Sequence, residues 1–201
     1  MRNDYAYIDP DQIYTDPQTG MLRNLADIKV QDDLEFFESA AVAKRIKELK
    51  EQPVNITDST TLLVIHKYLF QDVFQWAGQK RVVEISKRGN QFFPTSRFDT
   101  AFAYIDNLLA EFRSIDKADK RQIAEKLAAI LDAVNYLHPF REGNGRAQRE
   151  FIRILALEKS FELNLNPADN ACIYERYMTG TIEGDTNKLA ELILEILERL
   201  D

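Results

Sequence analysis

Cysteine is nearly absent from this chain: Cys172 is the only one among 201 residues. A single thiol cannot form a disulfide within the chain or a cysteine-based zinc site. This excludes the small secreted scaffolds that disulfides hold together. It is typical of a reducing compartment, so we expect a cytoplasmic location. Cys172 itself is expected to be a small buried side chain.

The chain also lacks an excess of basic residues and any long hydrophobic run. Lys and Arg total 26 against 33 Asp and Glu, a net charge of −7. Binding to nucleic acid needs a basic surface that releases counterions from phosphates, so we expect no direct nucleic-acid partner. The first residues are polar, and no apolar run approaches the length of a membrane span, so we expect no secretory signal and no membrane association.

What is present suits one globular domain, with 45% apolar residues. Residues 1–30 are rich in Asp, Pro, Tyr and Gly, which favours an irregular arm. Further along, apolar residues recur at helical spacing. This pattern predicts helices at 32–50, 60–74, 100–112, 120–137, 146–159 and 186–200, with a shorter one at 170–178.

One hairpin interrupts the helices. The β-branched residues of 81–86 and the segment 91–93 flank turn-forming residues at 87–90. We therefore expect an all-α helical bundle with one small β-hairpin. Its single domain, 1–201, divides into an arm and first helix (1–55), a core (56–165) and C-terminal helices (166–201).

The chemistry concentrates in the motif at residues 138–149, which read HPFREGNGRAQR. Pro139 disfavours helix at the residue before it, so the preceding helix should end near His138 and leave the imidazole at a rim. Gly143 and Gly145 let the backbone approach a ligand closely where the next helix begins. Unpaired N–H groups and the positive end of the helix dipole meet there, which predicts an anion site.

Three charged residues and His138 extend this anion site. Arg146 and Arg149 lie three positions apart, on one helix face, where both guanidinium groups can reach phosphate oxygens. Glu142 is a lone carboxylate beside the phosphates, as in many magnesium sites. His138, with an ordinary pKa of about 6.5, can take a proton from a hydroxyl nucleophile. The pattern indicates attack by a hydroxyl on a bound nucleoside triphosphate.

These residues resemble the Fic family motif, His-x-Phe-x-(Asp/Glu)-Gly-Asn-Gly-Arg-x-x-Arg, at all eight specified positions. The segments 66–78 and 22–24 and the hairpin are also similar to that family. The resemblance implies a Fic fold in a bacterial protein. It also implies transfer of AMP from ATP to a Tyr, Ser or Thr hydroxyl of a target protein, with release of pyrophosphate.

The resemblance also implies a role for each residue of the motif. His138 is the general base and Glu142 the Mg²⁺ ligand. The phosphates are bound by Gly143, Asn144, Gly145, Arg146 and Arg149. The family's hairpin, the flap, spans 81–94 here, and an extended target segment would pair with its exposed edge through main-chain hydrogen bonds. The flap residues that would dock the target are Lys87, Asn90, Gln91 and Phe92.

Several alternatives stay open. Phosphoryl or phosphocholine transfer uses the same fold, and a catalytically idle helical interaction module is a further possibility. Residues 179–184 match the family's inhibitory pattern, (Ser/Thr)-x-x-x-Glu-(Gly/Asn), whose Glu engages the second motif arginine, here Arg149. Two glycines disfavour a helix at 179–184, so we expect a loop there. We expect instead a toxin inhibited by a separate small antitoxin that supplies the inhibitory helix. His66 is expected to be structural, and Phe92 either lines the pocket or packs.

Overall fold

A computed structural model describes residues 5–9, 11–87 and 90–200. The helices are α1 (Gln31–Glu51), α2 (Thr61–Phe70), α3 (Phe98–Ser114), α4 (Lys120–Leu137), α5 (Asn144–Glu158), α6 (Ala171–Glu183) and α7 (Thr186–Ile196). A 3₁₀ turn, Thr95–Arg97, precedes α3. The short strands are β1 (Tyr5–Ile8), β2 (Glu84–Lys87), β3 (Asn90–Gln91), β4 (Phe161–Glu162) and β5 (Glu198–Arg199).

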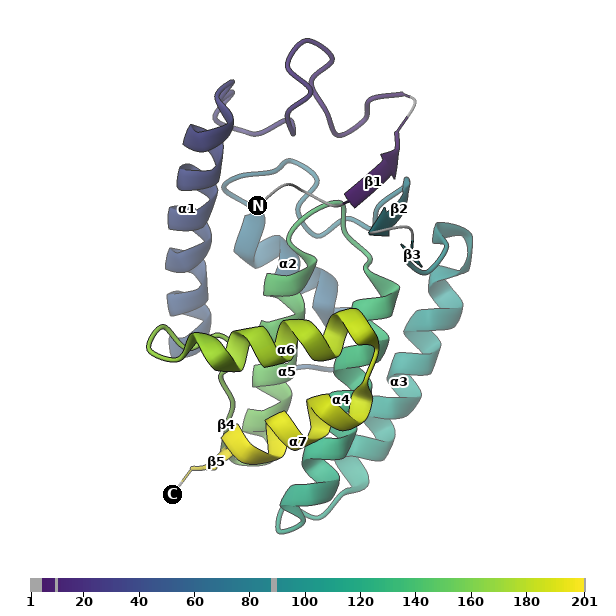
Figure 1. The fold of residues 1–201 in the computed structure, drawn as a ribbon, viewed down its shortest axis with the longest axis vertical. Coiled ribbons are helices and arrows are strands. Elements are labelled where there is room, and N and C mark those ends of the chain that lie inside the picture. The colour runs from purple at the N-terminus through teal and green to yellow at the C-terminus, as the bar shows by residue number, and fades with distance from the viewer. Residues whose placement is uncertain (1–4, 10, 88–89, 201) are drawn as a thin grey trace.

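Five helices pack in the order α3–α4–α5–α2–α1, with α1 at the edge of the molecule (Figure 1). Helix α7 packs on α4, and α6 packs on α7. The apolar residues at helical spacing form one buried cluster between these helices. Helix α4 lies at its centre and has eight buried residues. The expected all-α bundle with a small hairpin is confirmed.

The hairpin belongs to a three-stranded antiparallel sheet, in the order β1-β2-β3. Strand β1 pairs with β2 from Tyr5 opposite Lys87 to Ile8 opposite Glu84. The prediction that the arm is irregular is therefore wrong at 5–8, where aromatic and β-branched residues suit a strand and β2 offers an unpaired edge. Residues 1–4, 10, 88, 89 and 201, which belong to the predicted arm, hairpin turn and C-terminal region, lie outside the described residues.

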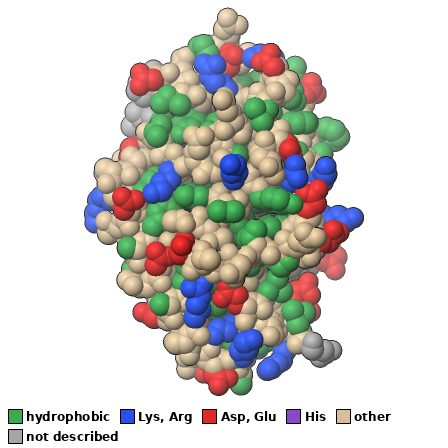
Figure 2. Space-filling model, turned by 180° about the vertical axis from the view of Figure 1, so that it is seen from behind, with side chains coloured by type: hydrophobic (Ala, Val, Ile, Leu, Met, Phe, Trp, Pro, Cys, Tyr) green, Lys and Arg blue, Asp and Glu red, His purple; other side chains and the backbone are tan. Residues whose placement is uncertain are grey.

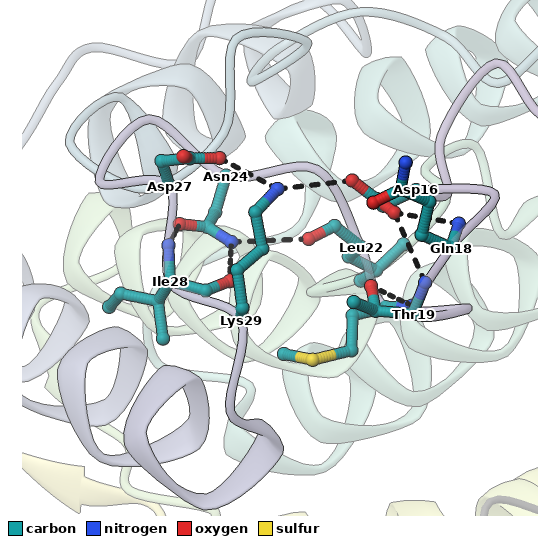
Figure 3. A network of polar contacts seen from close by, with 9 residues as sticks. Asp16, Gln18, Thr19, Leu22, Asn24, Asp27, Ile28 and Lys29 are labelled. Atoms are coloured by element: carbon teal, nitrogen blue, oxygen red, sulfur yellow. Dashed lines mark hydrogen bonds and ion pairs between the residues drawn. The ribbon is translucent and has the colours of Figure 1, made fainter.

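The rest of the arm is fixed by polar contacts (Figure 3). Asn24 donates to the carbonyls of Leu22 and Ile28 and accepts from the Ile28 N–H. Lys29 forms ion pairs with Asp16 at 3.0 Å and Asp27 at 2.7 Å. The hydrogen bond from Lys29 is the main reason why the pKa of Asp16 falls to about 2. An arm without a helical pattern is thus cross-linked by Asx-type hydrogen bonds and ion pairs.

The C-terminal region differs from the prediction in two ways. Helix α6 continues to Glu183, so 179–183 are helical and the expected loop there is wrong. The glycine at position 180 allows α6 and α7 to pack closely, because a Cβ there would lie 2.7 Å from Leu189 of α7. Helix α7 ends at Ile196, before the predicted 200, because β5 pairs with β4.

The surface carries charges of both signs. On the face opposite that of Figure 1, acidic and basic side chains are interspersed among the coloured residues (Figure 2). In the part of the chain that the structure describes, no helix has the length and apolar character needed to cross a membrane.

Cys172 is exposed, so the prediction that it is buried is wrong. It lies in the first turn of α6, whose first buried residue is Tyr177.

Candidate active site

The motif begins in a tight loop, residues 138–143, that joins α4 to α5. His138 ends α4 with a left-handed backbone, φ 44°. The Asn144 side chain closes the loop, because its Oδ1 accepts from the Phe140 N–H at 2.9 Å and its Nδ2 donates to the Phe140 carbonyl at 2.8 Å. This amide is buried and bound to the loop itself. The loop conformation is therefore held by a side chain of the motif itself.

The His138 ring is buried, and only 6% of the residue is exposed. Its Nδ1 lies 3.2 Å from the Asn135 carbonyl, which can only accept, so Nδ1 carries the proton and Nε2 is the basic nitrogen. The Phe92 ring stacks on it at 3.7 Å. Burial lowers the pKa of His138 to about 3. The predictions of a rim position and an ordinary pKa are therefore wrong in this conformation, since the flap covers the imidazole.

Glu142 and Gly143 lie where the loop meets α5. The Gly143 N–H donates to Oε1 of Glu142 at 2.9 Å. Gly143 has φ 81°, and a Cβ on it would lie 2.3 Å from Cζ of Phe70. The following residues, Asn144 and Gly145, begin α5, and the first N–H groups of a helix have no acceptor within it. The glycine turn and the helix start that the prediction of an anion site relied on are therefore both formed.

His66, on α2, contacts the motif loop through a hydrogen bond and ring stacking. The Gly78 N–H donates to Nδ1 at 2.9 Å, so Nε2 carries the proton and donates to the Glu142 carbonyl at 3.0 Å. Its ring stacks on Phe140 at 3.7 Å. Burial lowers the pKa of His66 to about 3, so it stays neutral. The expected structural role agrees with these contacts, and one of them joins His66 to the backbone of Glu142.

The two motif arginines have different neighbours. Arg146 forms an ion pair with Glu38 of α1, and its guanidinium lies 4.7 Å from the centre of the Phe70 ring. Arg149 turns back along α5: a Cβ on Gly145 would lie 3.3 Å from its Nη1. The guanidinium of Arg149 lies 5.4 Å from the Tyr174 ring of α6 and 5.6 Å from that of Tyr177. Each arginine is thus held against a helix distant in sequence.

The flap is tied to the motif by a buried arginine. The Nε of Arg81 donates to the His138 carbonyl at 2.8 Å, and its Nη atoms donate to the carbonyls of Val83 and Phe93, both at 2.6 Å. Gln91 of β3 is exposed and pairs with Ser86 of β2. Lys87, opposite Asn90, is close enough for its charge to help lower the pKa of His138. Of the predicted docking residues, Phe92 and Lys87 therefore lie beside His138.

One edge of the flap is occupied by the chain itself. Strand β1 pairs with β2 along Glu84–Lys87. The prediction of an exposed hairpin edge is therefore wrong for β2, and it can apply only to the side of β3.

The inhibitory pattern at 179–184 does not engage the second motif arginine in this structure. Glu183 is half exposed and pairs with Lys188 at 2.5 Å. Arg149 lies against the two tyrosines of α6 instead. The helix that contains the pattern is therefore used here for packing on α7.

Metal binding by the protein alone finds no support among the described residues. No group of three or more His, Cys, Asp or Glu side chains in them could hold an ion.

A cavity of about 100 Å³ lies between α1 and α5 and is lined by Lys50, Arg146, Arg149 and Arg153, among others. Glu150 also lines it and pairs with Arg153 at 2.8 Å, so the excess of basic groups comes from Lys50, Arg146 and Arg149.

The comparisons with known proteins bear directly on this site. The Fic/DOC family model matches residues 56–156, which include α2, the flap and the motif. The chain belongs to the Fic/DOC family.

Relatives with curated names support the membership. Protein adenylyltransferase VbhT of Bartonella schoenbuchensis is 38% identical over 152 residues, which are 75% of this chain and 32% of VbhT. Probable protein adenylyltransferase y4lH of Sinorhizobium fredii is 32% identical over 181 residues, 90% of this chain and 91% of that protein. The chain thus spans about a third of the length of VbhT and nearly all of y4lH.

Among solved structures, BepC of Bartonella tribocorum with bound AMPPNP is similar with a TM-score of 0.81. It is 21% identical, and the match covers 94% of this chain and 98% of that one. At this identity the likeness shows the Fic fold.

Three residues contact the motif in ways that the sequence does not predict. Glu38 and Arg81 carry no pattern that links them to the motif, since they lie 108 and 57 positions from the groups they bind. His66 stood out as one of only two histidines, but nothing in the sequence pairs it with the Glu142 carbonyl. These contacts exist only in the folded chain.

Proposed function

We propose that this protein is a protein adenylyltransferase, which transfers AMP from ATP to a Tyr, Ser or Thr hydroxyl of a target protein. The observation that carries the proposal is the complete motif around one helix N-terminus, with His138 in the tautomer that leaves Nε2 basic. The names of VbhT and y4lH support it. We further propose that residues 1–201 act as one Fic domain.

In the proposed reaction the target hydroxyl oxygen attacks the α-phosphorus of ATP. The bond from that phosphorus to the bridging oxygen breaks, and pyrophosphate leaves. The hydroxyl proton passes to Nε2 of His138, which is neutral at pH 7 because burial lowers its pKa to about 3. Phe92 covers the ring, so the entering target side chain displaces Phe92, and the imidazole becomes a stronger base.

The α5 N-terminus would hold the phosphates. The N–H groups of Asn144 and Gly145 at a helix start suit anionic oxygens. The Gly143 N–H would join them once it is released from Oε1 of Glu142, and Arg146 and Arg149 would bind the β- and γ-phosphates. Preorganised donors of this kind stabilise the charge that develops during transfer.

Glu142 would hold Mg²⁺. Its side chain is about one-third exposed, and a lone carboxylate fits an ion whose other ligands are phosphate and water oxygens. When bound, Mg²⁺ would neutralise phosphate charge and orient the leaving group.

For the target, we propose docking at the flap through Lys87, Asn90, Gln91 and Phe92. Since β1 occupies the β2 edge, the side of β3 is the one that remains for an extended target segment among the described strands.

For regulation, we propose that the protein is a bacterial cytoplasmic toxin and that a small antitoxin supplies the inhibitory helix. The pairing of Glu183 with Lys188 is consistent with a partner-supplied inhibitor. Glu183→Gly should leave activity unchanged without a partner. A rise in activity would indicate self-inhibition by 179–184 and contradict this proposal.

The decisive experiment is transfer of label from α-³²P-ATP and, separately, γ-³²P-ATP to proteins of a bacterial lysate. We expect label from the α position only, and a loss of at least about 10²-fold in His138→Ala. ATP binding by this variant, measured by calorimetry, should be retained. Label from γ-³²P-ATP would indicate a kinase instead. No label with either nucleotide would favour phosphocholine transfer or an idle interaction module.

A further inference from the structure

Arg146, proposed above to bind phosphate, is attached to the edge helix of the bundle. Glu38 lies on α1, 108 positions earlier, and its carboxylate accepts a hydrogen bond from Nη2 of Arg146. The two side chains are 12% and 25% exposed, so the pair is largely withdrawn from water. An ion pair in such surroundings is screened less than a surface pair.

Other contacts complete the surroundings of the guanidinium. It lies over the Phe70 ring of α2 at 4.7 Å, and Oε1 of Glu142 is 3.9 Å from Nη2. Glu38 is therefore the contact that links Arg146 to α1, while Phe70 and Glu142 link it to α2 and the motif loop. Three parts of the chain meet at this one side chain.

Arg146 would have room to move if Glu38 were removed. The cavity of about 100 Å³ between α1 and α5 borders Arg146 and is also lined by Lys50 and Arg149. An arginine has several rotatable bonds, and fixing them in advance lowers the cost of forming phosphate bonds.

We propose that Glu38 is a positioning residue: it fixes the guanidinium of Arg146 between α1 and α5 before nucleotide binds. The pair uses Nη2, and an arginine has further N–H groups for phosphate oxygens. This inference rests on the proposed function, because Arg146 meets phosphates only if the chain binds a nucleotide.

The test is calorimetric binding of ATP and of AMP, which lacks the β- and γ-phosphates. Glu38→Ala should weaken ATP binding about ten-fold and leave AMP binding unchanged. Glu38→Gln retains an acceptor oxygen and should stay within about three-fold of wild type. The control is Glu35→Ala, which removes the same charge from an exposed position one turn earlier on α1 and should bind ATP as wild type does. Thermal unfolding of each variant checks that it is folded.

A double-mutant cycle separates positioning from a general effect on structure. In an Arg146→Ala background, Glu38→Ala should weaken ATP binding no further. If Glu38→Ala weakens ATP binding equally in both backgrounds, the positioning role of Glu38 is contradicted. It is also contradicted if Glu38→Ala alone binds ATP as tightly as wild type or more tightly. If wild type binds AMP and ATP equally, Arg146 does not bind the β- and γ-phosphates. The positioning role of Glu38 is then contradicted, whereas the proposed function is not. If wild type binds neither, the proposed function fails with it.

Discussion

Gly143 and Gly184 both adopt a left-handed backbone, with φ 81° and 64°, yet their surroundings differ. A Cβ on Gly143 would enter the Phe70 ring, whereas nothing lies within 4 Å of one on Gly184. A glycine is thus required at position 143 by both the backbone conformation and the lack of space for a Cβ. At position 184 only the backbone conformation requires it.

Alanine substitutions should separate these requirements. Gly184→Ala should lower the free energy of unfolding by about 1 kcal/mol, the cost of a left-handed alanine. Gly143→Ala should lower it by about 3 kcal/mol, since overpacking against a buried ring is added. Urea unfolding of the two variants measures both values. Equal losses would show that Phe70 moves aside freely.

At the scale of elements, the flap controls the surroundings of the base. Phe92 of the flap stacks on His138, and burial is the main cause of the low pKa of that histidine. Phe92→Ala should expose the ring and raise the pKa of His138 from about 3 towards its ordinary value of about 6.5. Titration of the imidazole by NMR measures this. His66, which packs on Phe140 instead, serves as the internal control and should keep a pKa of about 3. An unmoved His138 would contradict the covering role of Phe92.

The contact between α6 and α7 explains a glycine that helix propensity disfavours. In an exposed helix, Gly→Ala stabilises by about 1 kcal/mol. Gly180→Ala should instead destabilise by about 1–3 kcal/mol, because its Cβ would lie 2.7 Å from Leu189, which is fully buried. In a Leu189→Ala background the same substitution should become neutral or stabilising. Urea unfolding of the four proteins tests this, and destabilisation of equal size in both backgrounds would argue against the contact.

At the scale of the whole molecule, the two buried histidines make stability depend on pH. Their pKa values are lowered to about 3, whereas in the unfolded chain each is about 6.5. Between these values the unfolded chain binds protons that the folded chain does not. The free energy of unfolding should therefore fall as pH decreases from about 6.5 to 3, by at most about 1.4 kcal/mol per pH unit for each histidine.

Urea unfolding at pH 7.5, 6 and 5 measures this slope. The free energy of unfolding of His66→Asn should depend less steeply on pH than that of the wild type, by the contribution of one histidine. This difference is expected whatever the absolute stability of the variant. The carboxylates are common to both proteins, so the difference isolates His66. Parallel slopes would mean that His66 titrates normally in the folded protein.

The sequence by itself determined the bundle and the motif, because both are local patterns. Helical spacing of apolar residues predicted a helix at 120–137, where α4 lies, and the glycines and arginines of 138–149 predicted an anion site at a helix start. These patterns depend on neighbours a few positions apart, which any conformation of the segment keeps together. Where a local rule was outweighed by packing, as at Gly180, the prediction was wrong.

Only the tertiary structure decided how the motif is held and covered. Glu38, His66 and Arg81 reach it from 57 to 108 positions away, and no spacing rule connects residues so far apart. The burial of His138 depends on Phe92 folding over it. The physical reason is that burial and ion pairing depend on which distant segments meet, and that is determined when the helices pack and β1 joins the flap.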